Sequence, residues 1–104
     1  VVTDSERCLP ADTTVLQTME ANDGGTRAVT VIGGNGHDVR TNGDHLRRAL
    51  QERGFRLVNE DAVRAAGQPV VSMWQSGQGE EAIVTVVDSG THRAVTVHRT
   101  KEPK

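Results

Sequence analysis

The chain has 104 residues, of which 35% are hydrophobic and 25% charged, and its formal net charge is −2. This length fits one domain, residues 1–104, and leaves little room for a second. Acidic and basic residues are mixed along the chain, so no electrostatic footprint for DNA or RNA is present. Phe55 and Trp74 are the only aromatic residues, which leaves few platforms on which bases could stack. We therefore expect one globular domain that binds no nucleic acid.

The N-terminal segment Val1–Pro10 is polar and without period, and we interpret it as a loose arm. Its Cys8 is the single cysteine, which excludes an internal disulfide. A free thiol is expected, with an intermolecular disulfide or a lipid attachment as alternatives. Because the first residue is Val1 and not Met, we expect a removed leader, a trimmed larger protein or an unusual start codon. The apolar runs are too short to span a bilayer.

A hairpin is expected next along the chain. Alternating residues over Thr13–Glu20 predict a strand. The segment Ala21–Gly25 is rich in Asn, Asp and Gly, which accept the backbone angles of a tight turn. A second strand should then cover Thr26–Ile32, and a glycine-rich loop, Gly33–His37, should follow it.

A helix is expected after this loop. Thr41 or Asn42 can cap its first turn, and Gly54 ends it in the usual position after the last helical residue. Residues at helical spacing form an apolar stripe that should pack on a sheet. They are Leu46, Ala49 and Leu50.

The remaining chain is predicted to be mainly strands. Tight turns join the last three strands, which should form an antiparallel meander. The fold class is therefore α+β, a single mostly antiparallel sheet of five or six strands with one long helix on one face, in the order β-β-α-β-(short α)-β-β-β. The expected elements are strands Phe55–Val58, Pro69–Gln75, Glu81–Val87 and His92–Thr100, an ambiguous short helix over Glu60–Ala66, and a polar tail, Lys101–Lys104.

The glycine-rich loop is the most suggestive motif. A strand that runs through glycines into a helix is the order of a dinucleotide-binding unit. Val39 replaces the third glycine of that motif, the expected helix cap comes too late, and the C-terminal half is a meander. A connecting loop is therefore preferred to a nucleotide site, and a small-ligand or anion contact is kept as an alternative. The residues that would carry it are Gly33, Gly34, Asn35, Gly36 and His37.

No catalytic or metal motif is evident. The four histidines, His37, His45, His92 and His98, lack the spacing of a zinc site. No serine lies in a nucleophile elbow, and the paired carboxylates are adjacent, which on a strand directs them to opposite faces. We expect no catalytic residue, no metal and no cofactor; a small enzyme or metal protein remains a minor alternative.

Four residues are candidates for partner binding. Trp74 is expected to be a core residue under the second, short helix; the alternative, if the long helix covers the side of Val71 and Met73, is a partly exposed anchor for a partner. If the final strand lies at a sheet edge, its charges would discourage indiscriminate pairing, and a partner strand with complementary charges could still pair there; the alternatives are a central strand or a solvated edge. The charged candidates are Arg93, His98 and Arg99.

Two segments, Leu9–Val15 and Asp44–Val58, resemble small extracytoplasmic bacterial domains of lipoproteins and envelope assembly factors. In those domains a helix followed by Gly and an aromatic residue packs on an antiparallel sheet. The resemblance implies an extracytoplasmic location, periplasmic, secreted or envelope-anchored, and a non-catalytic role. We therefore expect an interaction or assembly domain of an envelope or secreted bacterial protein, whose partner is another protein or a second copy bound through a sheet edge.

Overall fold

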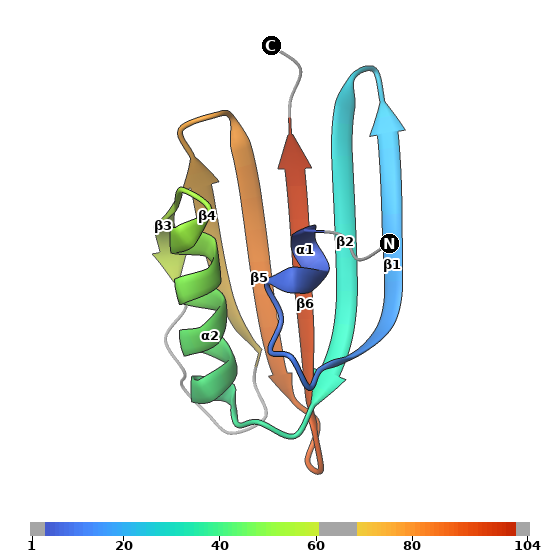
Figure 1. Cartoon of the computed structure of the whole chain (residues 1–104), viewed down its shortest axis with the longest axis vertical. Coiled ribbons are helices and arrows are strands. Elements are labelled where there is room, and N and C mark those ends of the chain that lie inside the picture. The colour runs from blue at the N-terminus through green and yellow to red at the C-terminus, as the bar shows by residue number, and fades with distance from the viewer. Residues whose placement is uncertain (1–3, 61–68, 102–104) are drawn as a thin grey trace.

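The fold is a six-stranded antiparallel sheet with two helices on one face, shown by a computed structural model that describes residues 4–60 and 69–101 (Figure 1). This confirms the predicted α+β class. The short helix expected over residues 60–66 lies outside the described residues, apart from Glu60, which ends a strand. The elements are α1 (Asp4–Arg7), β1 (Thr14–Asp23), β2 (Thr26–Asn35), α2 (Val39–Glu52), β3 (Phe55–Glu60), β4 (Val70–Ser76), β5 (Glu80–Asp88) and β6 (Arg93–Lys101).

The strand order across the sheet is β1-β2-β6-β5-β4-β3. After the β1–β2 hairpin, α2 crosses the sheet and delivers the chain to β3 at the far edge. The meander from β3 to β6 then returns until β6 pairs with β2. The final strand is therefore central, and the edge alternative for it is wrong. The two edge strands are β1 and β3. Because α2 carries the chain past the position beside β2, that position is taken only by the last strand, β6.

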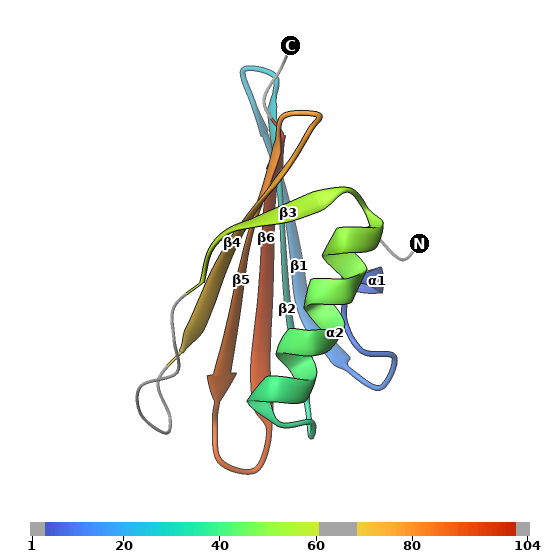
Figure 2. The ribbon, with the colours of Figure 1, turned by 90° about the vertical axis from the view of Figure 1, so that its left-hand side faces the viewer.

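The two faces of the sheet differ in what covers them. Val31, Val97 and Val84 are aligned across β2, β6 and β5, and all three are buried. Both helices lie on this side of the sheet (Figure 2). The neighbouring positions, such as Thr30 and Ile83, point to the opposite side and are only partly buried. No helix among the described residues covers that second face, which we call the open face.

Helix α2 begins earlier than the sequence predicted. Asp38, not Thr41 or Asn42, is the N-cap, and its carboxylate accepts a hydrogen bond from the Thr41 amide at 2.7 Å. Asp38 is the cap because its carboxylate accepts from an amide of the first turn that has no partner within the helix. The predicted stripe of Leu46, Ala49 and Leu50 is buried against the sheet. Among the described residues, no helix is long and apolar enough to cross a membrane.

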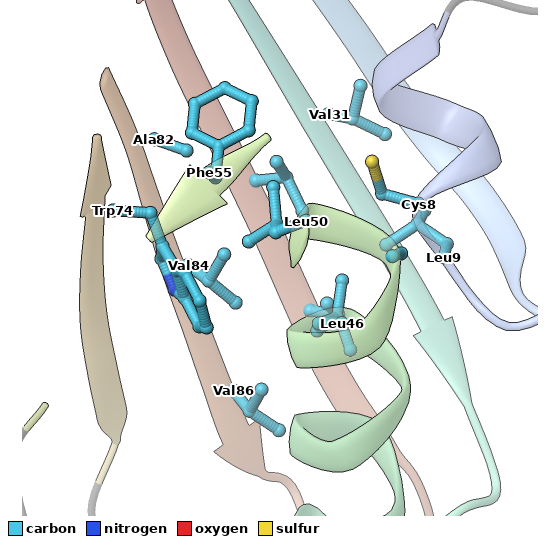
Figure 3. Packing of buried hydrophobic residues seen from close by; sticks show 13 residues of the cluster. Cys8, Leu9, Val31, Leu46, Leu50, Phe55, Trp74, Ala82, Val84 and Val86 are labelled. Carbon is cyan, nitrogen blue, oxygen red and sulfur yellow. The ribbon is translucent and has the colours of Figure 1, made fainter. Parts of the chain in front are cut away.

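The N-terminal segment is packed from Asp4 onward and is not a loose arm. Helix α1 lies over the sheet beside α2 (Figure 1). Cys8 and Leu9 are 0% and 5% exposed and belong to the main hydrophobic cluster (Figure 3). The sequence pattern missed this because only two apolar residues, Cys8 and Leu9, anchor the segment. Cys8 is a free, buried cysteine, and burial raises the pKa of its thiol.

Candidate functional site

The Gly33–His37 segment is not a loop throughout. Gly33, Gly34 and Asn35 complete β2 and pair with Val95, Ala94 and Arg93 of β6. A Cβ atom on Gly33 would lie 2.7 Å from Thr13 Cγ2. Glycine is therefore favoured at position 33 by the close packing of Thr13, just before β1, over β2.

Two asparagines join the end of β2 to the start of α2. Asn35 Nδ2 donates to Asn42 Oδ1 at 2.7 Å, and Asn42 Nδ2 donates back to Asn35 Oδ1 at 2.9 Å. Asn35 also donates to Thr13 Oγ1 and accepts from the His37 amide, each at 3.0 Å. Asn42 is fully buried. This pair uses polar groups that a ligand at the segment would need, so its evident role is structural.

His37 is paired with a residue of the connection between α1 and β1. Its Nε2 lies 2.8 Å from Asp12 Oδ1 at the protein surface. The hydrogen bond with His37 lowers the pKa of Asp12 below its ordinary value. Ligand binding at Gly33–His37 stays a prediction, and its polar side chains are already engaged within the protein.

The four candidate partner residues do not converge. Trp74 is 3% exposed on the face that α2 covers, so it is a core residue. Arg93 and Arg99 point to the same face of the sheet as Trp74, the face that α2 covers. His98 lies on the open face, where its Nδ1 is 2.6 Å from Thr30 Oγ1. All three charged candidates belong to the central strand β6, whose two backbone edges are occupied by β2 and β5.

Arg99 is the centre of an ion-pair cluster that holds α1 on the sheet. Its guanidinium donates to Asp4 Oδ2 at 2.6 Å and to Glu80 Oε2 at 2.7 Å. The guanidinium also lies 5.2 Å from the centre of the Phe55 ring. Arg53 donates to Asp4 Oδ1 at 3.0 Å. The cluster links both helices to the sheet, which is a structural task.

A cavity of about 520 Å³ lies between the N-terminal half of α2 and strands β4 and β5. Figure 3 shows Trp74, Val84 and Val86 on one side and Leu46 of α2 on the other. Sequence reasoning did not anticipate this space, because it depends on how far the helix stands from the sheet. Its apolar walls are Val39, Leu46, Val70, Trp74, Val84 and Val86.

Large apolar side chains are exposed on β1, on β3 and on the open face of the sheet. Strand β1 exposes Val15 (41%), Leu16 (67%) and Met19 (45%). Met73 on the open face is 41% exposed, and Leu57 and Val58 are exposed on β3. Within residues 4–60 and 69–101, no three His, Cys, Asp or Glu side chains are grouped closely enough to hold a metal ion.

Comparison with known proteins does not assign the chain to a family. No family model matches the chain, and a search of curated proteins found no match. The geometry of the described residues therefore carries the functional argument. It offers two features beyond the packed core, the exposed edge of β1 and the cavity beneath α2.

Proposed function

We propose that this chain is a non-catalytic interaction domain and that an extended segment of another protein adds to its sheet along β1. The observation that carries the proposal is the position of β1. It is the first strand in the sheet order and pairs only with β2 among the described residues. Its outer row of backbone donors and acceptors is therefore free to pair with a further strand.

Strand β1 has little of the protection that edge strands usually carry. It is ten residues long and contains no lysine or proline. One bulge, between Val15 and Gln17, interrupts the pairing near its start, and Glu20 is drawn toward Arg27 at 3.6 Å. Seven residues, Gln17–Asp23, remain in regular register. This length suffices for a short strand of a partner.

Apolar side chains flank this edge on both faces of the sheet. Met19 is aligned with Thr30 and lies on the open face, whereas Val15 is aligned with Gly33 on the helix face. A partner strand with alternating apolar residues could therefore pack a side chain beside each. The other edge, β3, is shorter, at six residues, and carries a bulge between Leu57 and Asn59. These differences favour β1.

An extracytoplasmic location, in an envelope or secreted bacterial protein, is part of the same proposal. Its support is the resemblance of Leu9–Val15 and Asp44–Val58 to small domains of that compartment. Fractionation of the native cells with an antibody against this domain tests the location, and recovery with the cytoplasmic fraction would exclude it.

Selection of random peptides displayed on phage tests strand addition directly. We expect enriched peptides to slow amide hydrogen exchange over Gln17–Asp23 and to leave β3 unchanged. Met19→Lys should weaken binding by about tenfold or more, because a charge then lies beside the added strand. Met73→Lys is the matched control, a methionine of similar exposure away from β1, and should bind within about twofold of the wild type.

Two outcomes of this selection would contradict the proposal. Slower amide hydrogen exchange in β3 would show that peptides add to the opposite edge of the sheet and not to β1. Loss of binding in Met73→Lys with retention in Met19→Lys would assign the contact to the open face. Sedimentation of the free chain completes the test, since a dimer that Met19→Lys dissociates would make a second copy, and not another protein, the occupant of β1.

A further inference from the structure

The backbone of β1 offers its outward hydrogen-bonding groups at alternate residues. A two-residue turn, Gly24–Gly25, joins β1 to β2, and both glycines have positive φ angles, 58° and 89°. In such a hairpin the two residues beside the turn exchange both backbone hydrogen bonds, and pairs of this kind recur at every second residue. Asp23 is aligned with Thr26, so its backbone groups face β2. The residues of β1 whose backbone groups instead point away from β2 are Thr18, Glu20 and Asn22.

The side chains of these residues lie on the helix face of the sheet. Thr18 is aligned with the buried Val31, and Glu20 with Val29, which packs against the core cluster. Thr18 Oγ1 donates to Oε1 of Glu6 in α1 at 2.7 Å. The carboxylates of Glu6 and Glu20 therefore both lie beside the helix face of this edge.

Ion pairing within the protein leaves Glu20 accessible. Arg27 Nη2 lies 3.6 Å from Glu20 Oε1, a loose contact between two exposed side chains. Arg27 belongs to β2, so it approaches Glu20 from the inner side of β1. A cationic side chain on an added strand would approach Glu20 from the outer side, where opposite charges on neighbouring strands attract.

The open face of the same edge is apolar. Met19 and Ala21 alternate with the residues whose backbone groups point outward, and they are aligned with Thr30 and Ala28 on the open face. Both are exposed. In an antiparallel strand added at this edge, the residues opposite Met19 and Ala21 would form the pairs without hydrogen bonds, in which the Cα atoms lie only about 4.5 Å apart. Apolar side chains on the added strand would therefore pack closely here.

We propose that β1 selects an amphipathic cationic strand, with lysine or arginine opposite Thr18 and Glu20 and apolar residues opposite Met19 and Ala21. This inference rests on the proposed strand addition and names the chemistry of the partner. Antiparallel addition continues the pattern of the sheet, in which the described strand pairs are antiparallel. The two unlike sides fix the register of the added strand, because a shift of one residue would exchange them.

Three fluorescein-labelled peptides test the preference for cations. The probe is Val-Thr-Val-Lys-Val-Lys-Val, and the two comparison peptides carry glutamine or glutamate in place of both lysines. Fluorescence anisotropy measures the binding of each peptide to the whole chain. We expect the glutamine peptide to bind about fivefold more weakly than the probe, since each exposed ion pair contributes little. The glutamate peptide should bind at least about tenfold more weakly, because like charges repel.

A variant of Glu20 assigns this preference to the helix face. In Glu20→Gln, the fivefold difference between the lysine and glutamine peptides should fall to about twofold, because one of the two attractions is lost. The matched control is Glu52→Gln, which removes an exposed carboxylate at the end of α2, across the sheet from β1 (Figure 1). This control should keep the difference at about fivefold. Thermal unfolding establishes that both variants are folded.

Hydrogen exchange of the complex tests the register. The bound lysine peptide should newly protect the amides of Thr18, Glu20 and Asn22, because their backbone groups pair with the added strand. The amides of Met19 and Ala21 should change little, since β2 already protects them.

Three results would overturn the proposal. Equal binding of the lysine and glutamine peptides would show that β1 does not select cations, even if both peptides slow exchange in β1. Loss of the preference in Asp23→Asn with retention in Glu20→Gln would place the cations on the open face. A lysine peptide that protects no amide of β1 would show that this class of strand does not bind there. Strand addition itself is decided by the peptides selected on phage, so the two proposals fail separately.

Discussion

At the scale of single residues, the core depends on a few aliphatic side chains. Leu50 is 0% exposed and lies in the central cluster between α2 and the sheet (Figure 3). Leu50→Ala should lower the free energy of unfolding by roughly 2–5 kcal/mol, because it removes buried surface and leaves a void. Urea denaturation measures this loss. An unchanged midpoint would contradict the placement of the helix.

The buried Asn35–Asn42 pair is a second determinant at this scale. Asn42 Nδ2 donates to Asn35 Oδ1 at 2.9 Å and to the carbonyls of His37 and Asp38, each at 3.2 Å. Asn42→Ala should cost about 1–3 kcal/mol, because it removes the hydrogen bonds that this side chain makes inside the protein.

A double-mutant cycle separates this pair from its surroundings. Asn35→Ala and Asn42→Ala together should cost less than the sum of the two single changes, since each single change leaves the other amide without its partner. Equal, additive losses would show that the two side chains act independently.

At the scale of elements, α1 is a helix too short to form alone. The cluster around Arg99 and the burial of Cys8 and Leu9 hold it in place. Desolvation would raise the pKa of Asp4, but hydrogen bonds from Arg99 and Arg53 outweigh it and lower that pKa below the ordinary value of 3.8. A lowered pKa in the folded state stabilises the protein above pH 3.8 and ceases to do so as pH falls through and below that value.

This linkage predicts an acid-dependent contribution from Asp4. Because the Asp4 side chain is 55% exposed, its effect should be no more than about 1 kcal/mol. Asp4→Asn should lose stability at pH 7 and differ little from the wild type near pH 2, as thermal unfolding can measure. The control is Asp23→Asn, an exposed carboxylate in β1, which should change stability little at either pH. Equal deficits for Asp4→Asn at both pH values would exclude the linkage.

The strand order makes a further prediction at the element scale. In β6, the amides of Ala94–Val97 should all be protected from hydrogen exchange, because β2 and β5 occupy both sides. In β1, only the amides that face β2 should be protected, in alternation. Nuclear magnetic resonance resolves the two patterns residue by residue. Alternate protection in β6 of the monomer would contradict the central position.

At the scale of the whole molecule, the structure places two separate surfaces on one small sheet. The edge of β1 lies at one end of the strand order, and the cavity lies beneath α2 over β4 and β5. The helices cover one face and leave the open face with partly exposed Thr, Val, Ile and Met side chains. The proposed strand addition at β1 would therefore leave the space beneath α2 uncovered.

The local pattern of the chain determined most of the elements. Alternation along Glu81–Val87, the stripe at Leu46 and Leu50, and the turn signals predicted strands, helix and hairpins, because these depend on neighbours in sequence. The pattern predicts too late a start for the helix, because Asp38, Thr41 and Asn42 are all suitable cap residues. Only the hydrogen bond from the Thr41 amide identifies Asp38 as the cap.

Tertiary structure alone decided where these elements lie relative to one another. The central position of β6, the burial of Cys8 and Leu9, and the assignment of Trp74 to the helix face follow from long-range pairing, which no local pattern encodes. The cavity depends on the same packing, because its walls come from α2 and from strands β4 and β5, which are far apart in the sequence. A Cβ atom at position 43 would meet no heavy atom within 4 Å, and this clearance follows from how α2 packs on the rest of the molecule.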